Sequence, residues 1–178
     1  NGLLFEEITA SNLVKIDLEG RILQDSTGLG VLPGGYNFHS AVYVARADAA
    51  CAVHTHSAAT LAVGAQKEGL LNLSQHAMRF HDRVAYYDYV GFVTGEEERR
   101  HVREALGGKM VLVMRNHGLL VVGKSIHEAF ILSYYFETAC RYQVAIQSCN
   151  AGFICASEQV AEQTAQGFEK TPWEDRKS

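Results

Sequence analysis

The sequence predicts an α/β fold in which helices pack on a mixed β-sheet. Segments with strand-like and helix-like patterns interleave along the 178 residues, and several neighbouring strands are joined by short turns. Short turns join antiparallel strands, whereas intervening helices join parallel ones, so both kinds of pair are expected in the sheet. The length fits one domain with a substantial core.

The expected elements follow from local patterns, in chain order. Alternating apolar and polar residues predict a strand at 13–17, and a turn at 18–21 leads to a returning strand at Ile22 and Leu23. The Gly- and Pro-rich residues 24–35 are expected to form a loop. Helices are expected at 39–46, 57–67, 96–106, 125–148 and 157–166. Further strands are expected at 50–56, 84–90, 109–115 and 119–122, and residues 70–83 are left unassigned.

Capping residues and glycines define the expected helix ends. The hydroxyls of Ser57 and Ser125 can accept a hydrogen bond from the first turn of a helix, and Glu128 completes a capping box with Ser125. The three glutamates after Gly95 suit the positive end of a helix dipole. Gly107 is expected to stop the helix that these glutamates begin.

Composition and charge argue against two classes of partner. Hydrophobic residues make up 47% of the chain, charged residues 20%, and the net charge is −4, so neither nucleic acid nor an acidic membrane is an expected partner. No apolar run reaches the roughly 18 residues of a membrane helix, and the opening residues are not expected to be a signal peptide. The four cysteines lack a Cys-x-x-Cys pair and are expected to be free thiols, which suggests a cytoplasmic protein.

The first candidates for chemistry are His54 and His56, at the end of the apolar strand expected at 50–56. Side chains at positions i and i+2 of a strand point to the same face, so the two imidazoles would lie side by side. This arrangement provides the first two nitrogen ligands of a divalent transition metal. The pattern leaves an alternative open, in which one histidine is a core residue and the other is exposed.

His117 is the candidate third ligand. It follows a buried strand in the turn Asn116-His117-Gly118, and strand ends are frequent places for binding residues. Gly118 allows the backbone to approach a ligand closely. Spacing alone does not bring His117 to His54 and His56, so the pattern does not decide whether the three form one site.

Three stretches, in this order, resemble the class II aldolase/adducin family, closest to the adducin-like branch and its bacterial relatives. They are LPGGYNFHSAVY at 32–43, AVHTHS at 52–57 and RNHGL at 115–119. The opening residues 2–15 also resemble the adducin head domain. The resemblance implies that His54, His56 and His117 bind a divalent metal, with Zn2+ as the first expectation and Mn2+ or Fe2+ as alternatives.

The resemblance also implies architecture and assembly. Residues 1–178 would form a single three-layer α/β/α domain with a mixed, mostly antiparallel central sheet, and a C-terminal tail would begin at about 168. A homo-oligomer is implied, often a tetramer, with sites near subunit boundaries and a small-molecule substrate. Family domains normally carry several dozen residues before a segment like Asn1-Gly2, and this chain is expected to lack them.

Three neutral imidazoles leave coordination positions open, which is typical of catalytic sites. In aldolases that this sequence resembles, the metal binds oxygens of a ketone donor and stabilises an enolate-like intermediate, and the same electron sink suits decarboxylation. Sugar-phosphate aldolases carry a glutamate just before the position of His39, whereas the turn here reads Pro33-Gly34-Gly35-Tyr36. A phosphorylated-sugar aldolase of the usual kind is therefore not expected.

Other residues are candidates for proton transfer or substrate binding. His76 lies about where such aldolases place a tyrosine that works across a subunit boundary, and Tyr36 stands beside the vacant glutamate position. The alternatives are a structural hydrogen bond for His76 and a packed aromatic ring for Tyr36. Candidate substrate contacts are His39, Gly34 and Gly35.

Two functions from different classes remain. The first is a metal-dependent carbon–carbon lyase, either a decarboxylase or an atypical aldolase, acting on a small hydroxy or keto carboxylate or a carbonyl substrate. The second is a non-catalytic adducin-like module for oligomerisation or cytoskeletal binding. The three histidines favour the enzyme, and the missing glutamate favours the module or a changed chemistry.

Overall fold

The computed structural model describes residues 2–90 and 95–170. These residues fall into two compact units. The first consists of residues 2–47 and 95–104, and the second of residues 48–90 and 105–170. Helix α4 (Glu96–Leu106) begins in the first unit and ends in the second, as expected for 96–106. None of the described helices is long and apolar enough to cross a membrane.

The first unit contains a small antiparallel sheet, which confirms the hairpin expected at 13–23. The Asp17 carboxylate accepts hydrogen bonds from the backbone N–H groups of Glu19 and Arg21, and this closes the turn. Gly20, between them, has a φ of 85°, which glycine adopts without steric cost. The elements are the 3-10 turns η1 (Phe5–Glu7) and η2 (Ala10–Asn12) and the strands β1 (Lys15–Ile16) and β2 (Ile22–Gln24).

Helix α1 spans Pro33–Ala45, so the expectation of a loop through residue 35 is wrong for its last three residues. Pro33 stands at the start of the helix, where its missing N–H is not needed and its fixed φ is already helical. Gly34 and Gly35 therefore belong to the first helical turn, although two adjacent glycines are typical of loops.

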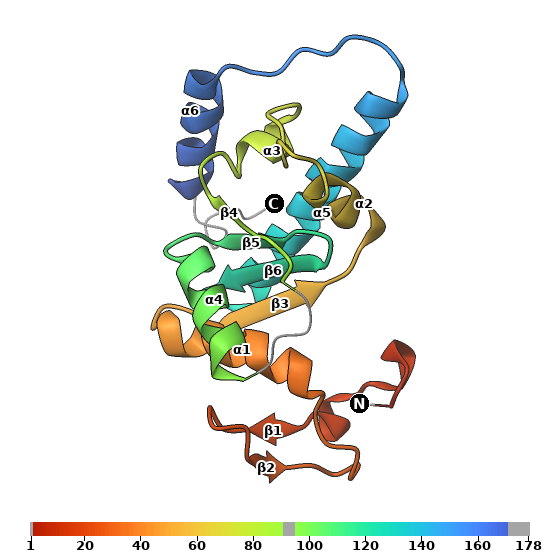
Figure 1. The fold of residues 1–178 in the computed structure, drawn as a ribbon, viewed down its shortest axis with the longest axis vertical. Coiled ribbons are helices and arrows are strands. Elements are labelled where there is room, and N and C mark those ends of the chain that lie inside the picture. Colours follow the sequence, from red (N-terminus) through yellow and green to blue (C-terminus); the bar gives the residue numbers. More distant parts are fainter. Residues whose placement is uncertain (1, 91–94, 171–178) are drawn as a thin grey trace. The chain divides into compact units, whose positions relative to one another are not determined.

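The second unit is built on a four-stranded sheet in the order β3-β6-β5-β4 (Figure 1). Strands β3 (Cys51–Thr55) and β5 (Val111–Met114) run antiparallel to β6 (Gly118–Gly123), while β4 (Val84–Tyr87) runs parallel to β5. The expected mixed, mostly antiparallel sheet is therefore confirmed. Strand β4 ends three residues before the expected end at 90.

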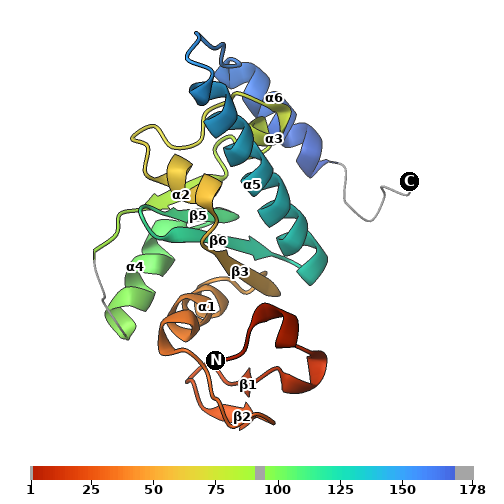
Figure 2. The ribbon, with the colours of Figure 1, turned by 90° about the vertical axis from the view of Figure 1, so that its right-hand side faces the viewer.

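The helices of this unit pack on the sheet and on one another. α5 (Ile126–Ser148) crosses the sheet, with α2 (Ala58–Gly64) beside it, and the short α3 (Gln75–Met78) contacts both α5 and α6 (Glu158–Glu169) (Figure 2). The side chains of Ser57 and Ser125 accept hydrogen bonds from Thr60 and Glu128, as expected for N-caps. α2 ends three residues earlier than expected, and α6 continues to 169 instead of 166. Residues 171–178 of the expected tail lie outside the described residues.

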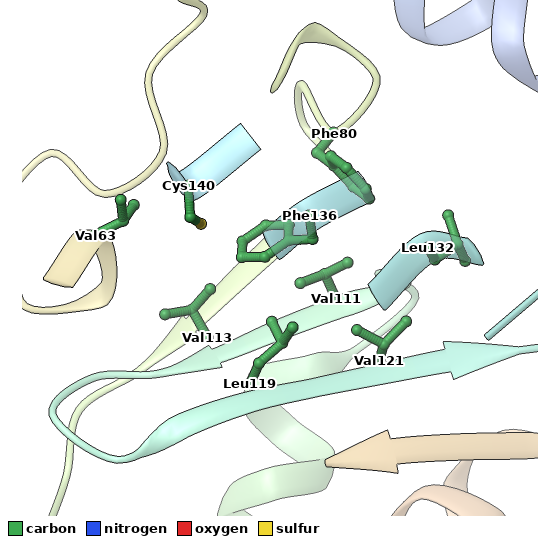
Figure 3. Close-up of a cluster of buried hydrophobic side chains, with 9 residues drawn as sticks. All are labelled: Val63, Phe80, Val111, Val113, Leu119, Val121, Leu132, Phe136 and Cys140. Atoms are coloured by element: carbon green, nitrogen blue, oxygen red, sulfur yellow. The ribbon is translucent and has the colours of Figure 1, made fainter. Parts of the chain in front are cut away.

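Nine buried side chains form the core between this helical layer and the sheet (Figure 3). Val111 and Val113 of β5 point toward α5 because alternate residues of a strand share a face. Gly64 lets α2 approach β5, since a β-carbon there would lie 2.9 Å from Cγ1 of Val113. On the opposite face, Leu112 and Leu120 are also fully buried. The other members of the cluster are Val63, Phe80, Leu119, Val121, Leu132, Phe136 and Cys140.

Candidate metal centre

Three histidine side chains meet at the end of β3. His54 lies on β3, His56 follows it directly, and His117 stands in the turn between β5 and β6. Their ring centroids are 4.7 to 5.2 Å apart, and one ring nitrogen from each lies within 4.8 Å of the others. Among the residues that the structure describes, this is the one cluster of three or more metal-ligating side chains.

The register between β3 and β6 places His54 on the face of the sheet that points away from α5. His54 pairs with Leu120, and paired residues of antiparallel strands share a face. Leu119, the next residue along, belongs to the core under α5, so Leu120 and His54 point to the other side. His56, two residues after His54, continues along the same face.

The turn that carries His117 has a defined geometry. The backbone N–H of His117 donates to the Met114 carbonyl at 3.0 Å, and Asn116 between them has a φ of 57°. A positive φ at the third residue of a four-residue turn is the type II requirement, which glycine or asparagine meets. The expectation that Gly118 lets the backbone approach a ligand closely stays a prediction. The missing side chain of Gly118 leaves room for the rings of His54 and His56.

Hydrogen bonding directs the ring of His54. Its Nδ1 lies 2.8 Å from the carbonyl oxygen of Leu119, which can only accept, so Nδ1 carries the proton and donates. The lone pair is then on Nε2, which faces Nε2 of His56 at 2.8 Å. A backbone carbonyl bound to the distal nitrogen is the usual orienting contact of a metal-binding imidazole.

The electrostatic setting of His117 favours its neutral imidazole. Burial lowers the pKa of His117, and the neighbouring His56 lowers it further. A neutral ring has the lone pair that a metal requires, whereas a protonated ring has none. His56 itself is exposed, so the cluster is open to solvent on its side.

Tyr89 is a neighbour of this cluster that the sequence patterns did not single out. Its ring centroid lies 5.8 Å from that of His117, and 44% of the residue is exposed. β4 and β5 are parallel, with Tyr87 paired to Met114, so residues just beyond both strands meet at one edge of the sheet. The approach of Tyr89 to His117 depends on that parallel pairing, which no local sequence pattern indicates.

His76 lies on α3, where its ring packs 4.9 Å from that of Tyr135 and 5.5 Å from that of Tyr142, both on α5. Among the contacts of the described residues, none joins His76 to the three histidines within one chain. A catalytic role for His76 across a subunit boundary stays a prediction.

The other candidates lie in the first unit. Tyr36 donates its hydroxyl proton to the Leu18 carbonyl at 2.7 Å. Tyr36, Gly35 and His39 line a largely apolar pocket of about 350 Å³, and burial lowers the pKa of His39. A β-carbon at Gly34 would meet nothing within 4 Å. Their roles in catalysis and substrate binding stay predictions.

Comparison with known sequences covers most of the chain. The family of class II aldolase and adducin N-terminal domains matches residues 1–144. Alpha-adducin of Mus musculus is 50% identical over 145 residues, which are 80% of this chain and 20% of that protein. A protein of Pseudomonas aeruginosa, provisionally named as an aldolase class 2 protein, is 43% identical over 153 residues, 86% of this chain and 59% of that protein.

Solved structures extend the likeness to three dimensions. An aldolase II superfamily protein from Pseudomonas syringae superposes with a TM-score of 0.89 at 45% identity, over 93% of this chain and 67% of that chain. An L-fuculose 1-phosphate aldolase from Glaciozyma antarctica superposes with a TM-score of 0.81 at 26% identity, over 93% of this chain and 64% of that one. The chain spans less than two thirds of the length of the two sequence relatives.

Proposed function

Because this chain belongs to the class II aldolase and adducin family, as its three motifs predicted, we propose that it is a metal-dependent carbon–carbon lyase. It would act as a decarboxylase or an atypical aldolase on a small hydroxy or keto carboxylate or a carbonyl substrate. The observation that carries this proposal is the convergence of ring nitrogens from His54, His56 and His117 within 4.8 Å.

The donor set fits a divalent transition metal. Imidazole nitrogens suit zinc, iron and related ions, with Zn2+ the first choice and Mn2+ or Fe2+ the alternatives. The Leu119 carbonyl fixes the ring of His54 with Nε2 directed toward the cluster. Three protein ligands leave coordination positions open for substrate. A bound metal would supply a Lewis acid that polarises a substrate carbonyl or hydroxyl oxygen.

Proton transfer requires a group other than the glutamate that is absent beside Gly34 and Gly35. Tyr89 is the candidate that the geometry favours, because its ring lies beside His117 and remains partly exposed. Its phenol hydroxyl can donate a proton to, or accept one from, a substrate oxygen at the cluster. His76 would contribute from a neighbouring subunit, and Tyr36 is a further candidate.

Assembly and location are part of the same proposal. The family match covers residues 1 to 144, which supports one domain, and Gly34, Gly35 and His39 would contribute to substrate binding. A homo-oligomer, in particular a tetramer, would allow His76 to reach the site of a second chain. Four free thiols support a reduced compartment such as the cytoplasm.

A second function is favoured by a specific observation, the 50% identity to alpha-adducin. The turn at 33–36 has no carboxylate, so the family fold could serve oligomerisation or cytoskeletal binding without catalysis. The histidine cluster would then be a structural remnant or a structural metal site.

Metal analysis of the purified protein tests the site. We expect about one divalent ion per chain in the wild type and loss of that ion in His54→Ala and in His117→Ala, since each removes one of three ligands. His127→Ala, at an exposed position on α5, is the matched control and should keep the ion. Full metal retention in either site variant would rule out the three-histidine centre.

A substrate panel then separates the two functions. Decarboxylation and retro-aldol cleavage are measured on small hydroxy and keto carboxylates, with metal-loaded wild type and His117→Ala compared. Turnover that depends on His117 supports the lyase. A metal-loaded, stably oligomeric protein that is inert across the panel would support the binding module.

A further inference from the structure

The carboxylate of Glu137 on α5 binds the segment that leaves the metal centre. Ser57, the residue after His56, donates its hydroxyl proton to Oε2 of Glu137, and Thr60 donates to the same oxygen at 2.8 Å. We propose that Glu137 is a positioning residue for the metal centre, which fixes the direction of the chain after His56 through Ser57. The inference rests on the metal site of the proposed function.

The hydroxyl of Ser57 is fixed from two sides. Its oxygen accepts the backbone N–H of Thr60 at 3.4 Å, as the cap of α2, while its proton goes to Glu137. Hydrogen bonds to an ionised carboxylate are shorter and stronger than those between neutral groups. The first turn of α2 is therefore attached to α5 by two such bonds, not by its cap alone.

The position of His56 depends on this attachment more than the positions of its partners do. The ring of His54 is held by the Leu119 carbonyl, and the backbone of His117 is held by the Met114 carbonyl. His56 is exposed, and in the described part of the chain its ring is hydrogen-bonded only to His54. Apart from ring contacts with its two partners, its orientation depends on the backbone on either side, which includes Ser57.

Glu137 is held in place by its neighbours on α5. Phe136 and Cys140, on either side of Glu137 along α5, are fully buried in the main core (Figure 3). Thr60 is 1% exposed, so the second hydroxyl is also enclosed. Burial raises the pKa of the Cys140 thiol to about 12, so Cys140 stays neutral and adds no second charge beside Glu137.

The opposite end of α2 is also held by hydrogen bonds to a charged side chain. Arg115, two residues before His117, donates to the carbonyl of Gly64 at 3.0 Å and to that of Gln66 at 2.6 Å. α2 therefore joins the two chain segments that carry the ligands. Glu137 ties the His56 end of this segment to α5, while Gln143 and Gln147 of α5 bind Gln66 just past its other end.

Titration with Co2+, followed by its visible absorption, tests the inference without requiring a substrate. Glu137→Leu removes the acceptor, and we expect Co2+ affinity to fall by about 10- to 100-fold, the usual effect of losing an outer-shell contact, with an altered spectrum. Glu137→Gln keeps an oxygen that can accept both hydroxyls, and it should restore binding and the wild-type spectrum. Gln147→Ala is the matched control, since it removes the two hydrogen bonds between Gln147 and Gln66 beyond the far end of α2 and leaves Ser57 untouched.

Wild-type affinity and spectrum in Glu137→Leu would overturn the inference, as would an equal loss in Gln147→Ala, which would indicate general loosening. If Glu137→Leu fails to fold, Ser57→Ala decides, because it removes the link and leaves the carboxylate in place. Failure of the proposed function looks different, since wild type itself would then not bind Co2+. Failure of this inference alone leaves wild-type binding intact and removes only the difference between variants.

Discussion

A β-carbon on Gly118 would lie 2.6 Å from the Cδ2 atom of His56. It would lie equally close to the Thr55 carbonyl oxygen, which belongs to the paired backbone of β3 and cannot move cheaply. The histidine cluster and the sheet therefore both require glycine at this position.

Gly118→Ala should displace the ring of His56 and reduce metal affinity by more than about tenfold, with a loss of roughly 1–3 kcal/mol in the free energy of unfolding from overpacking. Calorimetric metal titration and urea unfolding measure the two effects. Gly108→Ala is the control, since a β-carbon there meets nothing within 4 Å. Unchanged metal binding in Gly118→Ala would contradict the role of Gly118 in making room for the cluster.

Tyr89→Phe should lower turnover by about 10²- to 10⁴-fold, the range for loss of a general acid or base, while the bound metal stays. The phenyl ring keeps the packing against His117 and lacks the hydroxyl. Turnover of the substrate found in the panel is measured together with metal content. Tyr134→Phe, exposed on α5, serves as control, and an unchanged turnover in Tyr89→Phe would assign proton transfer to another residue.

Arg115→Met should lower the free energy of unfolding by about 2–3 kcal/mol, because hydrogen bonds from a charged donor to the carbonyls at the end of α2 are lost. The ring of Tyr86, 4.6 Å below the guanidinium, loses a cation–π contact as well. Urea unfolding measures the loss. Arg100→Met, which breaks an exposed ion pair with Glu104, should change stability by less than about 1 kcal/mol, and an equal effect of both would contradict the anchoring role.

The ion pair between Arg83 and Glu162 predicts an acid-dependent loss of stability. The hydrogen bond from Arg83 lowers the pKa of Glu162 from its ordinary 4.5 to about 2. The folded state thus favours the charged carboxyl more than the unfolded chain does, so this stabilisation is complete above pH 4.5 and disappears as the pH falls toward 2.

Urea unfolding of wild type and Glu162→Gln across this range measures the effect. The difference in unfolding free energy should be constant near neutral pH and should shrink to zero at the acid end. Because Glu162 holds α6 to the start of β4, α6 should detach first. A difference that persists unchanged at pH 2 would show that the variant acts through packing and not through charge.

Local patterns were sufficient to predict the strands and to place His54 and His56 side by side. The apolar run that begins at residue 50 predicts β3, and the period of two residues in a strand puts His54 and His56 on one face. Ser125 and Glu128 predict the start of α5, and the glutamates after Gly95 predict α4. Each of these rests on contacts within a few residues along the chain.

Contacts that depend on pairing between distant segments were not available to the same reasoning. The approach of His117 to His54 requires the register of β3 against β6, and that of Tyr89 requires the parallel pair of β4 and β5. The contact between Ser57 and Glu137 joins residues 80 positions apart. The start of α1 was missed for a local reason, since Gly34 and Gly35 have weak helix propensity and Pro33 compensates for it.

The register of β3 against β6 also sets the order in which the metal centre can form during folding. β5 and β6 are joined by a three-residue turn and can pair early, since their loop is short. β3 has to find β6 across a sequence separation of 65 residues between His54 and Leu119, and such long-range pairings form slowly. We therefore expect the turn with His117 to form before its partners arrive. A partly folded chain offers a metal one ligand from the turn and two from a separate segment, so only the completed sheet can hold the ion with all three.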